Sequence, residues 1–453
     1  MLEKKQNRLA GKKIKLNGYR FLNNMLRKFI YLLGQNIRNP SLKKHFYFLK
    51  KSENWSLEEL ENYQFKKLKE LLLVANEHSE FYKNKFIEFD LDVNKISKLS
   101  DIKSIPILTK SELLSNSKSI HTNLKFKKTF LATTSGTSGK TLKFNREETA
   151  DSFNRAAIQR GYSWFNIQPW FRNGYFWGFN FSFIQKIKNN FLDFLQNRYR
   201  IFSYEENEIK NFIKQTKNAS FISGYSSMIY QTAVYLNKST LEKPKKLKMV
   251  KGTSEKVLNI YQEEVKKAFG VKMISEYGAT EAGIIAFECT EGNMHINMEG
   301  VLVEEIDQEI LVTNLQMQSF PIIRYKLGDY VTLAPRSKKC SCGKSHLIID
   351  EVTGRVGKSI YGKTNIYPSL YFYYIFKNLG NTFQIFLNYQ VIQEKKGKLT
   401  FLIEQELSKY ELEQLNTEIL KYFKEDIFYN IIPNSDFKKT KGKLKNFISL
   451  IDE

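Results

Sequence analysis

Cysteine is scarce in this chain, with three residues among 453, two of them in the segment Cys340-Ser-Cys342. So few thiols exclude a disulfide framework. The sequence also has no apolar run long enough to span a bilayer. Its basic N-terminal segment has neither the apolar region nor the small-residue cleavage site of a secretory signal. We therefore expect a cytoplasmic protein.

Internal repeats and low-complexity linkers are also lacking. Hydrophobic residues make up 42% of the chain and aromatic residues 14%, which excludes a disordered protein. A folded chain of 453 residues is long enough for two or three domains with sizeable cores.

Positive charge is abundant, with a formal net charge of +24. The lysines are spread along the whole chain, and no RNP, KH or zinc-finger signature concentrates them, so we expect no nucleic-acid partner. The amphipathic segment 19–34 is consistent with a helix packed against a domain. The alternative is at most peripheral contact with an anionic membrane, which for a bacterial cell would be the inner membrane.

Helical and extended patterns alternate along the first 350 residues. A capping-box pattern at Ser56 and Glu59 opens a helical region over 56–87, and Thr109 is a fair N-cap for a second helix. Aromatic residues predict a strand over 174–183. Residues 273–288 predict two strands joined by a tight turn, and 301–335 alternate as strands do, with a turn predicted at Gly328-Asp329.

The pattern changes after Gly354. Residues 383–404 predict a hairpin and 407–424 a helix, which makes a small α+β unit. We therefore predict an α/β protein. Its predicted parts are a basic helical extension (1–55), a large N-terminal domain (56–354) and a small C-terminal domain (355–453).

The segment LATTSGTSGKTLKF (131–144) carries the first functional signal. Gly136 and Gly139 allow the backbone to approach an anion closely, while the surrounding hydroxyl and amide groups can cradle phosphate oxygens. Lys140 or Lys143 would add positive charge. The spacing before the lysine is too short for a Walker loop, and alone such a segment is more often a linker.

Four further clusters follow this loop in the chain: GTSE (252–255), EYGATEAG (276–283), RYKLGD (324–329) with GR (354–355), and TKGKLK (440–445). In this order and spacing the five clusters resemble the adenylate-forming superfamily, and within it the phenylacetate–coenzyme A ligase and CapK-type proteins. The resemblance runs from about residue 60 to the C-terminus. It implies a ligase that uses ATP and Mg²⁺ to convert a carboxylic acid into acyl-AMP.

The same resemblance implies a nucleotide site. Phosphate binding falls on the hydroxyl and glycine loop, which comprises Thr133, Thr134, Ser135, Gly136, Thr137, Ser138, Gly139 and Lys143. The GTSE cluster contributes Gly252 and Glu255. In EYGATEAG, Tyr277 would stack on adenine, Gly278 would permit close approach, Thr280 would bond the α-phosphate and Glu281 would hold Mg²⁺. Asp329 would accept hydrogen bonds from the ribose hydroxyls, and Arg355 would contact the nucleotide.

The resemblance also implies a catalytic lysine on the small domain, which rotates about a hinge near Gly357-Lys358 after adenylation. Lys443 in TKGKLK matches the Gly-Lys motif. Its ammonium would stabilise charge that develops between the carboxylate and the α-phosphate. Four neighbouring lysines are rivals for this role, and an ordinary solvated cluster is the alternative.

Three cysteines and a histidine suggest a metal site. Cys289, Cys340 and Cys342, with His295 or its rival His346, would give a closed tetrahedral Zn²⁺ site of structural type. Zinc occurs at similar elements in some relatives. The alternative is a set of buried thiols without a metal.

The sequence leaves open which acceptor receives the acyl group in the second half-reaction. Coenzyme A thiol would make the chain an aryl- or phenylacetate-type CoA ligase of metabolism. A sugar amine or polysaccharide precursor would place it in surface polysaccharide biosynthesis. An inactive, basic nucleotide-fold adaptor at the membrane is a third alternative. The acyl pocket is predicted between 176–181 and 224–227.

Overall fold

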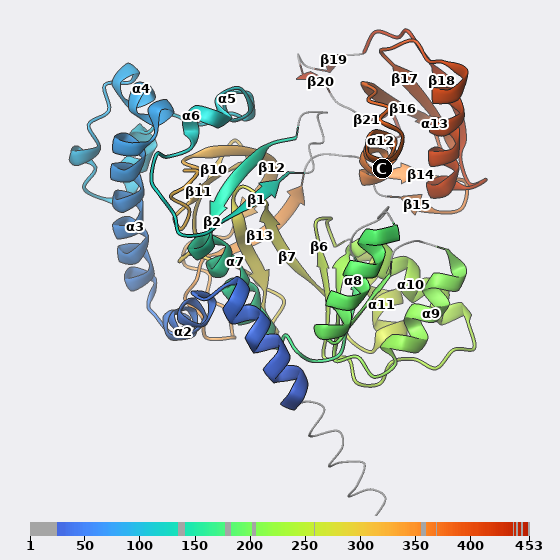
Figure 1. The fold of residues 1–453 in the computed structure, drawn as a ribbon, viewed down its shortest axis with the longest axis horizontal. Helices are drawn as coiled ribbons and strands as arrows, with labels where there is room; N and C mark the ends of the chain where they lie inside the picture. The colour runs from blue at the N-terminus through green and yellow to red at the C-terminus, as the bar shows by residue number, and fades with distance from the viewer. Residues whose placement is uncertain are drawn as a thin grey trace, which may run out of the picture.

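A computed structural model describes residues 25–451 apart from gaps at 135–140, 177–182, 202–204, 258, 355–358, 368, 438, 441–442 and 445–446. One large sheet forms the middle of the molecule, and a second, smaller α+β unit is built from the C-terminal hundred residues (Figure 1). The predicted fold class, α/β with a large and a small domain, is confirmed.

Helices fill the N-terminal part of the described chain. A helix over 25–38 is followed by α2 (Leu42–Ser52), α3 (Leu57–His78) and α4 (Glu80–Glu88). The predicted capping box is confirmed, because Ser56 accepts from the Glu59 amide and the Glu59 side chain accepts from the Ser56 amide. The single helical region predicted over 56–87 is two helices. Ser79 has an extended backbone and its hydroxyl caps α4, which ends α3.

Short elements lead to the first hairpin. The 3-10 helices η1 (Val93–Lys95) and η2 (Leu99–Ser104) precede α5 (Lys110–Ser115) and α6 (Ser117–Ile120). Thr109 caps α5 through a complete capping box, as predicted. The strands β1 (Thr129–Thr133) and β2 (Lys143–Glu147) pair antiparallel, and α7 (Glu148–Trp164) follows directly.

Half of the large sheet is parallel. Its strands are β3 (Asn173–Phe176), β4 (Arg198–Ile201), β5 (Phe221–Tyr225), β6 (Met249–Thr253) and β7 (Met273–Ala279). The connecting helices are α8 (Phe183–Leu195), α9 (Glu206–Thr216), α10 (Ser226–Lys238) and α11 (Asn259–Phe269). Of the strand predicted over 174–183, residues 174–176 lie in β3 and Phe183 belongs to α8, while 177–182 lie outside the described residues.

Alternating residues of these strands enter two cores. Ile222 and Val250 pack with α9, α10 and α11 on one face of the sheet. Phe221 and Met249, one position earlier on the same strands, pack on the other face with aromatic residues from the end of α7. Both faces of the parallel half are thus covered, as a buried parallel sheet requires.

The other half of the sheet is antiparallel. Its strands are β8 (Gly283–Glu288), β9 (Met294–Ile296), β10 (Val301–Ile306), β11 (Glu309–Asn314), β12 (Tyr325–Leu333) and β13 (Ile348–Gly354). The full order is β10-β11-β12-β13-β9-β8-β7-β6-β5-β3-β4. The predicted strand pair over 273–288 and the strands over 301–335 are confirmed.

The prediction of a turn at Gly328-Asp329 is wrong, because the segment is an irregular part of a strand. Gly328 has φ +84°, a value that glycine adopts without steric cost. Both residues nevertheless lie inside β12, where the register with β11 shifts. The irregularity is therefore a local distortion of one strand, and it lies at the predicted ribose-binding residue.

The C-terminal unit has its own four-stranded sheet in the order β18-β17-β16-β21. Its elements are β14 (Ile360–Tyr361), β15 (Ile366–Tyr367), α12 (Leu370–Phe383), β16 (Tyr389–Lys395), β17 (Lys398–Ile403), α13 (Lys409–Phe423), β18 (Phe428–Ile432), β19 (Lys439–Thr440), β20 (Lys443–Leu444) and β21 (Phe447–Ser449). The predicted hairpin within 383–404 and the helix within 407–424 are confirmed by β16, β17 and α13. The boundary at residue 354 stays a prediction.

The C-terminal unit contacts the large sheet through aromatic residues of α12. The Tyr374 ring lies edge-on to Tyr225 with centroids 5.4 Å apart, and Gln231 Nε2 on α10 donates to the Tyr371 hydroxyl at 2.7 Å. None of the described helices is long and apolar enough to span a membrane.

Candidate functional site

Three of the predicted motifs lie at the ends of adjacent parallel strands. Gly224 and Tyr225 end β5, Gly252 and Thr253 end β6, and Tyr277 lies near the end of β7. The strands β5, β6 and β7 are neighbours and run in the same direction. Ligands of open α/β sheets bind outside the carboxyl ends of such strands, so the fold brings these motifs to one edge where a ligand can bind.

Tyr277 and Asp329 meet although 52 positions separate them in the chain. The Tyr277 hydroxyl donates a hydrogen bond to Asp329 Oδ2 at 2.8 Å. The first residue belongs to β7 and the second to β12, and three strands lie between them in the sheet order. The residues predicted to bind adenine and ribose are thus neighbours, as a nucleoside site requires.

The predicted phosphate loop is the tip of the β1–β2 hairpin. The Thr134 amide donates to Leu142 O at 2.9 Å, and the Leu142 amide donates to Thr134 Oγ1 at 3.0 Å. Thr133 and Lys143 are partners in the last pair of the ladder, and both are exposed. The remaining loop residues lie outside the described residues, namely Ser135, Gly136, Thr137, Ser138, Gly139 and Lys140.

Arg146 connects this hairpin to the EYGATEAG turn, a contact that sequence reasoning missed. From β2 its guanidinium donates to the Thr280 carbonyl oxygen and lies 3.4 Å from Asp151 Oδ1. The Thr280 backbone is therefore fixed relative to the base of the phosphate loop. In the sequence, the only indication of this contact was the position of Arg146, three residues after Lys143.

The β7–β8 turn carries the predicted Mg²⁺ ligand. Thr280 is exposed, whereas Glu281 is buried. A Cβ at Gly278 would lie 2.6 Å from the Gly283 carbonyl oxygen, so only glycine fits where the two strands approach each other. The carboxylate and hydroxyl oxygens at this turn are donors of the kind that Mg²⁺ prefers.

A buried ion pair supports the same edge, and it too was missed. Lys251 on β6 pairs with Glu276 on β7, and Thr253 Oγ1 donates to Glu276 Oε1 at 3.1 Å. Burial alone would lower the pKa of Lys251, but the Glu276 carboxylate outweighs it and the pKa is raised. The ammonium therefore stays charged and holds Glu276 in place beside Tyr277.

The other predicted residues are placed as follows. Ser226 Oγ donates to the Glu255 carbonyl oxygen at 3.2 Å, which fixes the GTSE segment against the start of α10. Lys443 begins β20 and pairs with Thr440 of β19. In the view of Figure 1 this hairpin lies on the side of the C-terminal unit toward the large domain. Arg355 and the hinge residues Gly357 and Lys358 lie outside the described residues.

The predicted acyl pocket is only partly supported. Phe176 on β3 is the register partner of Gly224 on β5, so the two predicted segments meet at this pair. Residues 177–181 of the first segment lie outside the described residues. Phe176 is fully buried, and its ring lies 4.4 Å from the Phe212 ring in the core beneath α9. This side chain is therefore a core residue and not part of a pocket wall.

The three cysteines and His295 form a cluster. The ligand atoms of Cys289, His295, Cys340 and Cys342 lie within 4.8 Å of one another. The sulfurs of Cys289 and Cys340 are 3.7 Å apart, and Cys342 Sγ lies 3.2 Å from His295 Nε2. Zinc bonds of about 2.3 Å to sulfur place two thiolates about 3.7 Å apart in a tetrahedron. The donor set and its spacing therefore fit a four-ligand zinc ion.

His295 is the histidine of this cluster, and the rival His346 is not. His295 Nδ1 lies 3.1 Å from the His346 carbonyl oxygen, an arrangement that leaves Nε2 facing the cysteines. The His346 side chain points elsewhere, with Nε2 3.1 Å from Glu299 Oε1. The fold thus places His295, the predicted fourth ligand, beside the cysteines and not its rival His346.

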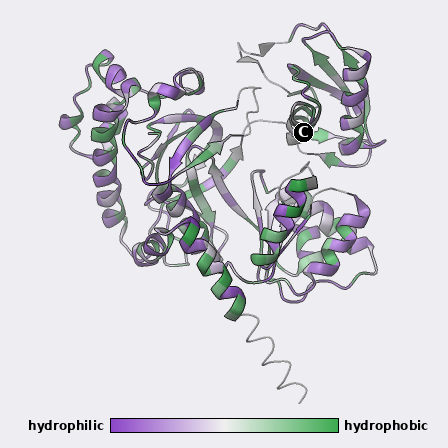
Figure 2. Cartoon of the chain, viewed as in Figure 1, coloured by the Kyte–Doolittle hydropathy of each residue, from purple (hydrophilic) through white to green (hydrophobic). Residues whose placement is uncertain are grey.

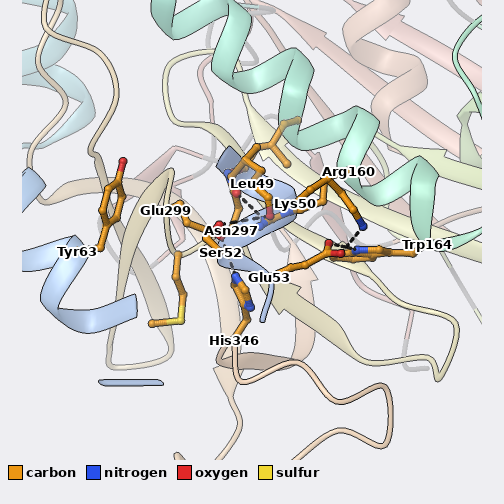
Figure 3. A network of polar contacts seen from close by, with 12 residues as sticks. Leu49, Lys50, Ser52, Glu53, Tyr63, Arg160, Trp164, Asn297, Glu299 and His346 are labelled. Carbon is orange, nitrogen blue, oxygen red and sulfur yellow. Dashed lines mark hydrogen bonds and ion pairs between the residues drawn. The ribbon is translucent and has the colours of Figure 1, made fainter. Parts of the chain in front are cut away.

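Glu299 is the centre of a buried polar network next to this cluster (Figure 3). It accepts from Arg160 Nη1 at 2.7 Å and from the Ser52 hydroxyl, which joins α2 and α7 to the sheet. Arg160 Nη2 donates to Asn297 Oδ1 at 2.8 Å. Burial raises the pKa of the Glu299 carboxyl, but the charge of Arg160 and the bonds from His346 and Ser52 outweigh it, so the pKa is lowered.

Replacement of Glu299 by glutamine is expected to lower the free energy of unfolding by about 3–5 kcal/mol, because the Arg160 charge stays buried without its partner. Denaturant unfolding at neutral pH measures this loss. The pKa of Glu299 is lower in the folded protein than in the unfolded protein. Its contribution to the free energy of unfolding is therefore present above the unfolded pKa and is lost as pH falls toward the folded pKa. The wild-type protein should therefore lose more stability on acidification than the Glu299→Gln variant.

Glu242→Gln is the matched control for this prediction. Glu242 also forms an ion pair, with Lys217, but both side chains are about half exposed. Exposed pairs contribute little to stability, so this variant should unfold close to the wild-type midpoint. Equal effects of the two substitutions would contradict the role assigned to the buried network.

Known proteins were compared with the chain. No protein-family model matches it. Protein CapK of Staphylococcus aureus is 24% identical over 318 residues, which cover 67% of this chain and 70% of the relative. Indoleacetate–lysine synthetase of Pseudomonas savastanoi is 25% identical over 162 residues, but the match spans only 38% of that relative.

Solved structures show the fold. A 2-hydroxyisobutyryl-CoA ligase in complex with 2-HIB-AMP and CoA, in the thioesterification state, has a TM-score of 0.64 at 14% identity, covering 88% of this chain and 91% of that one. An open conformation of the same ligase gives 0.56. The shared fold and the two relatives support the resemblance to the adenylate-forming superfamily that the motifs predicted. Within the superfamily the chain is CapK-like, at low identity.

Proposed function

We propose that the chain is an AMP-forming acid ligase. A carboxylate oxygen attacks the α-phosphorus of ATP, the bond to the β-phosphate oxygen breaks, and pyrophosphate leaves. The acyl carbon of the resulting acyl-AMP is then attacked by an acceptor, and AMP leaves. The observation that carries this proposal is the convergence of the sequence motifs at one sheet edge, where Tyr277 donates to Asp329.

Each step of adenylation has residues to serve it. Asp329 accepts hydrogen bonds from the ribose hydroxyls, and Tyr277 offers its ring to adenine while its hydroxyl holds Asp329. Thr280, whose backbone Arg146 fixes, bonds an α-phosphate oxygen. Mg²⁺ bound at Glu281 would neutralise phosphate charge. Lys443 stabilises the charge that develops on the α-phosphate.

The acid and the acceptor are proposed by class. The acid is a small organic carboxylate. The acceptor is a thiol or an amine, with coenzyme A first because the structural neighbour binds CoA and an acyl-AMP. An amine is the alternative acceptor, because one relative is an indoleacetate–lysine synthetase. Transfer to a sugar amine in surface polysaccharide biosynthesis rests on the CapK resemblance.

We also propose that Cys289, His295, Cys340 and Cys342 bind a structural zinc ion. Four protein ligands leave no open coordination position for a substrate, so the ion would have no catalytic role. Its place is the junction of β8, β9 and the segment before β13.

Acid-dependent exchange between ATP and labelled pyrophosphate tests the proposed activity. The panel should contain aryl, fatty, hydroxy and amino acids, followed by mass spectrometry of products formed with coenzyme A or amino sugars. We expect exchange with one acid class above the acid-free background. No exchange with any acid, together with no measurable ATP binding, would favour the inactive adaptor instead.

Asp329→Ala is expected to raise the KM for ATP in this assay by about tenfold to a hundredfold, because a charged hydrogen-bond acceptor for ribose is lost. Tyr277→Phe keeps the ring but loses the bond that positions Asp329, so the expected rise is about two- to tenfold with kcat nearly unchanged. Tyr63→Phe is the control, because it removes the hydroxyl of a tyrosine on α3 that accepts from Gln316 and is not part of the predicted nucleotide site. Equal KM values for all three variants would refute the ribose assignment.

A further inference from the structure

The helix over 25–38 exposes a continuous apolar stripe. Five of its hydrophobic side chains are between 51% and 69% exposed: Met25, Leu26, Phe29, Leu33 and Ile37. Two of them are adjacent and the others follow at intervals of three or four residues, so all five lie on one face of the helix. The opposite face is anchored. The Tyr31 ring lies 6.1 Å from Trp170, and Gln159 Nε2 on α7 donates to the Tyr31 hydroxyl at 3.2 Å.

The helix α8 exposes a second apolar stripe. Five large hydrophobic side chains are between 40% and 78% exposed, again at helical spacing: Ile184, Ile187, Phe191, Leu192 and Phe194. Hydrophobic colour runs along both helices in Figure 2. Single exposed hydrophobic residues are normal on a protein surface, but ten on two helices are unusual.

The helix over 25–38 and α8 meet at the C-terminal end of α8. Arg27 Nη1 donates to the Phe194 carbonyl oxygen at 2.8 Å, and the guanidinium lies 5.2 Å from the Phe194 ring centroid. We call the ten exposed side chains on these two helices the apolar platform. The apolar platform therefore consists of two stripes on helices that touch at one end.

The exposed charges on the helix over 25–38, on α2 and on α8 are all positive. No aspartate or glutamate occurs between Lys4 and Ser52. In α8 the one acidic residue, Asp193, is buried and paired with Arg200. Exposed cations flank the exposed hydrophobic residues: Lys28, Arg38, Lys43, Lys44, Lys186 and Lys188.

We propose that the apolar platform docks on the surface of an anionic phospholipid bilayer. Large apolar side chains would enter the interface between headgroups and acyl chains, while the flanking lysines and arginines contact lipid phosphates. A purely apolar partner surface would leave these cations unpaired, whereas anionic headgroups satisfy them. The inference is independent of the ligase activity, because none of its residues belongs to the nucleotide site.

Co-sedimentation with phospholipid vesicles tests the docking surface. The full chain is mixed with vesicles of equal parts phosphatidylcholine and phosphatidylglycerol, or of phosphatidylcholine alone. We expect strong binding to the first and at least about tenfold weaker binding to the second, falling further as salt is raised. Equal binding to both vesicle types, or none to the anionic one, would overturn the proposal.

Two variants and a matched control identify the surface. Phe29→Glu and Phe191→Glu should each weaken binding to the anionic vesicles by about tenfold or more, because a carboxylate replaces a side chain that enters the interface. Ile87→Glu adds the same charge at a position of similar exposure, 70% against 64% for Phe29, on α4, and should leave binding near wild type. An equal loss of vesicle binding in all three variants would show a general effect of the added charge and would contradict the assignment of the docking surface.

A second copy of the chain is the competing occupant. Sedimentation equilibrium of the wild-type protein without lipid distinguishes the two cases. A monomer is expected over the working concentration range. A stable dimer that Phe29→Glu dissociates would show that the apolar platform is a protein interface and would overturn membrane docking.

Discussion

Replacement of Lys443 by alanine is expected to slow acid-dependent ATP–pyrophosphate exchange by about a hundredfold or more, while the protein stays folded. The ammonium is proposed to stabilise charge that develops as the carboxylate attacks the α-phosphorus. A preorganised charge at that point has an effect of this size on the rate. Lys443 begins the two-residue strand β20, whose partner is β19. The core of the C-terminal unit is built from other elements, so its stability should not depend on this side chain.

Two controls make the result specific. Lys398→Ala removes an exposed lysine at the start of β17 in the same unit and should leave exchange unchanged. Synthetic acyl-AMP supplied with the acceptor bypasses adenylation, so Lys443→Ala should transfer the acyl group at nearly the wild-type rate. Exchange at the wild-type level in Lys443→Ala would show that one of the neighbouring lysines has the role.

Local sequence patterns predicted local structure well. Ser56 with Glu59, Thr109 with its helix and the hairpin of β16 and β17 depend on residues a few positions apart, and all are as predicted. The same patterns missed the break at Ser79. A serine within a helical pattern gives no sign that its hydroxyl will cap a new helix instead.

Contacts between distant residues could be predicted only through the resemblance. Spacing alone says nothing about Tyr277 and Asp329, which meet because the sheet brings β7 and β12 together. The resemblance named both residues, but it did not name Arg146 or Lys251. These two act through a backbone carbonyl and a buried carboxylate, so their function depends on three-dimensional packing that no short motif carries.

The metal cluster illustrates the same limit. From the sequence, His295 was the predicted fourth ligand beside the three cysteines, and His346 was its rival. The pairing of β9 with β13 aligns His295 with Ile348, and the His295 ring faces the cysteines while His346 joins Glu299. A choice that rests on which way two side chains point could be made only from the fold.

Cys340→Ser is expected to abolish zinc binding and to lower the melting temperature by about 5–15 °C, because structural zinc contributes directly to folding free energy. Cys340 is central to the cluster, since its sulfur also accepts from Asn293 Nδ2 at 3.2 Å. Metal analysis of protein produced with zinc should find about one ion per chain in the wild type. A chelator should destabilise the wild type and leave Cys340→Ser unaffected.

His295→Asn and His346→Asn separate the metal from the neighbouring network. The first removes a proposed ligand and should lose zinc. The second removes a partner of buried Glu299 and should lower stability while zinc remains bound, because its side chain is not part of the cluster. Both variants change one imidazole in the same region, so a general loss of packing would affect them alike. Metal-free wild-type protein that melts at the same temperature as Cys340→Ser would instead leave the cysteines as buried thiols, held together by packing and hydrogen bonds alone.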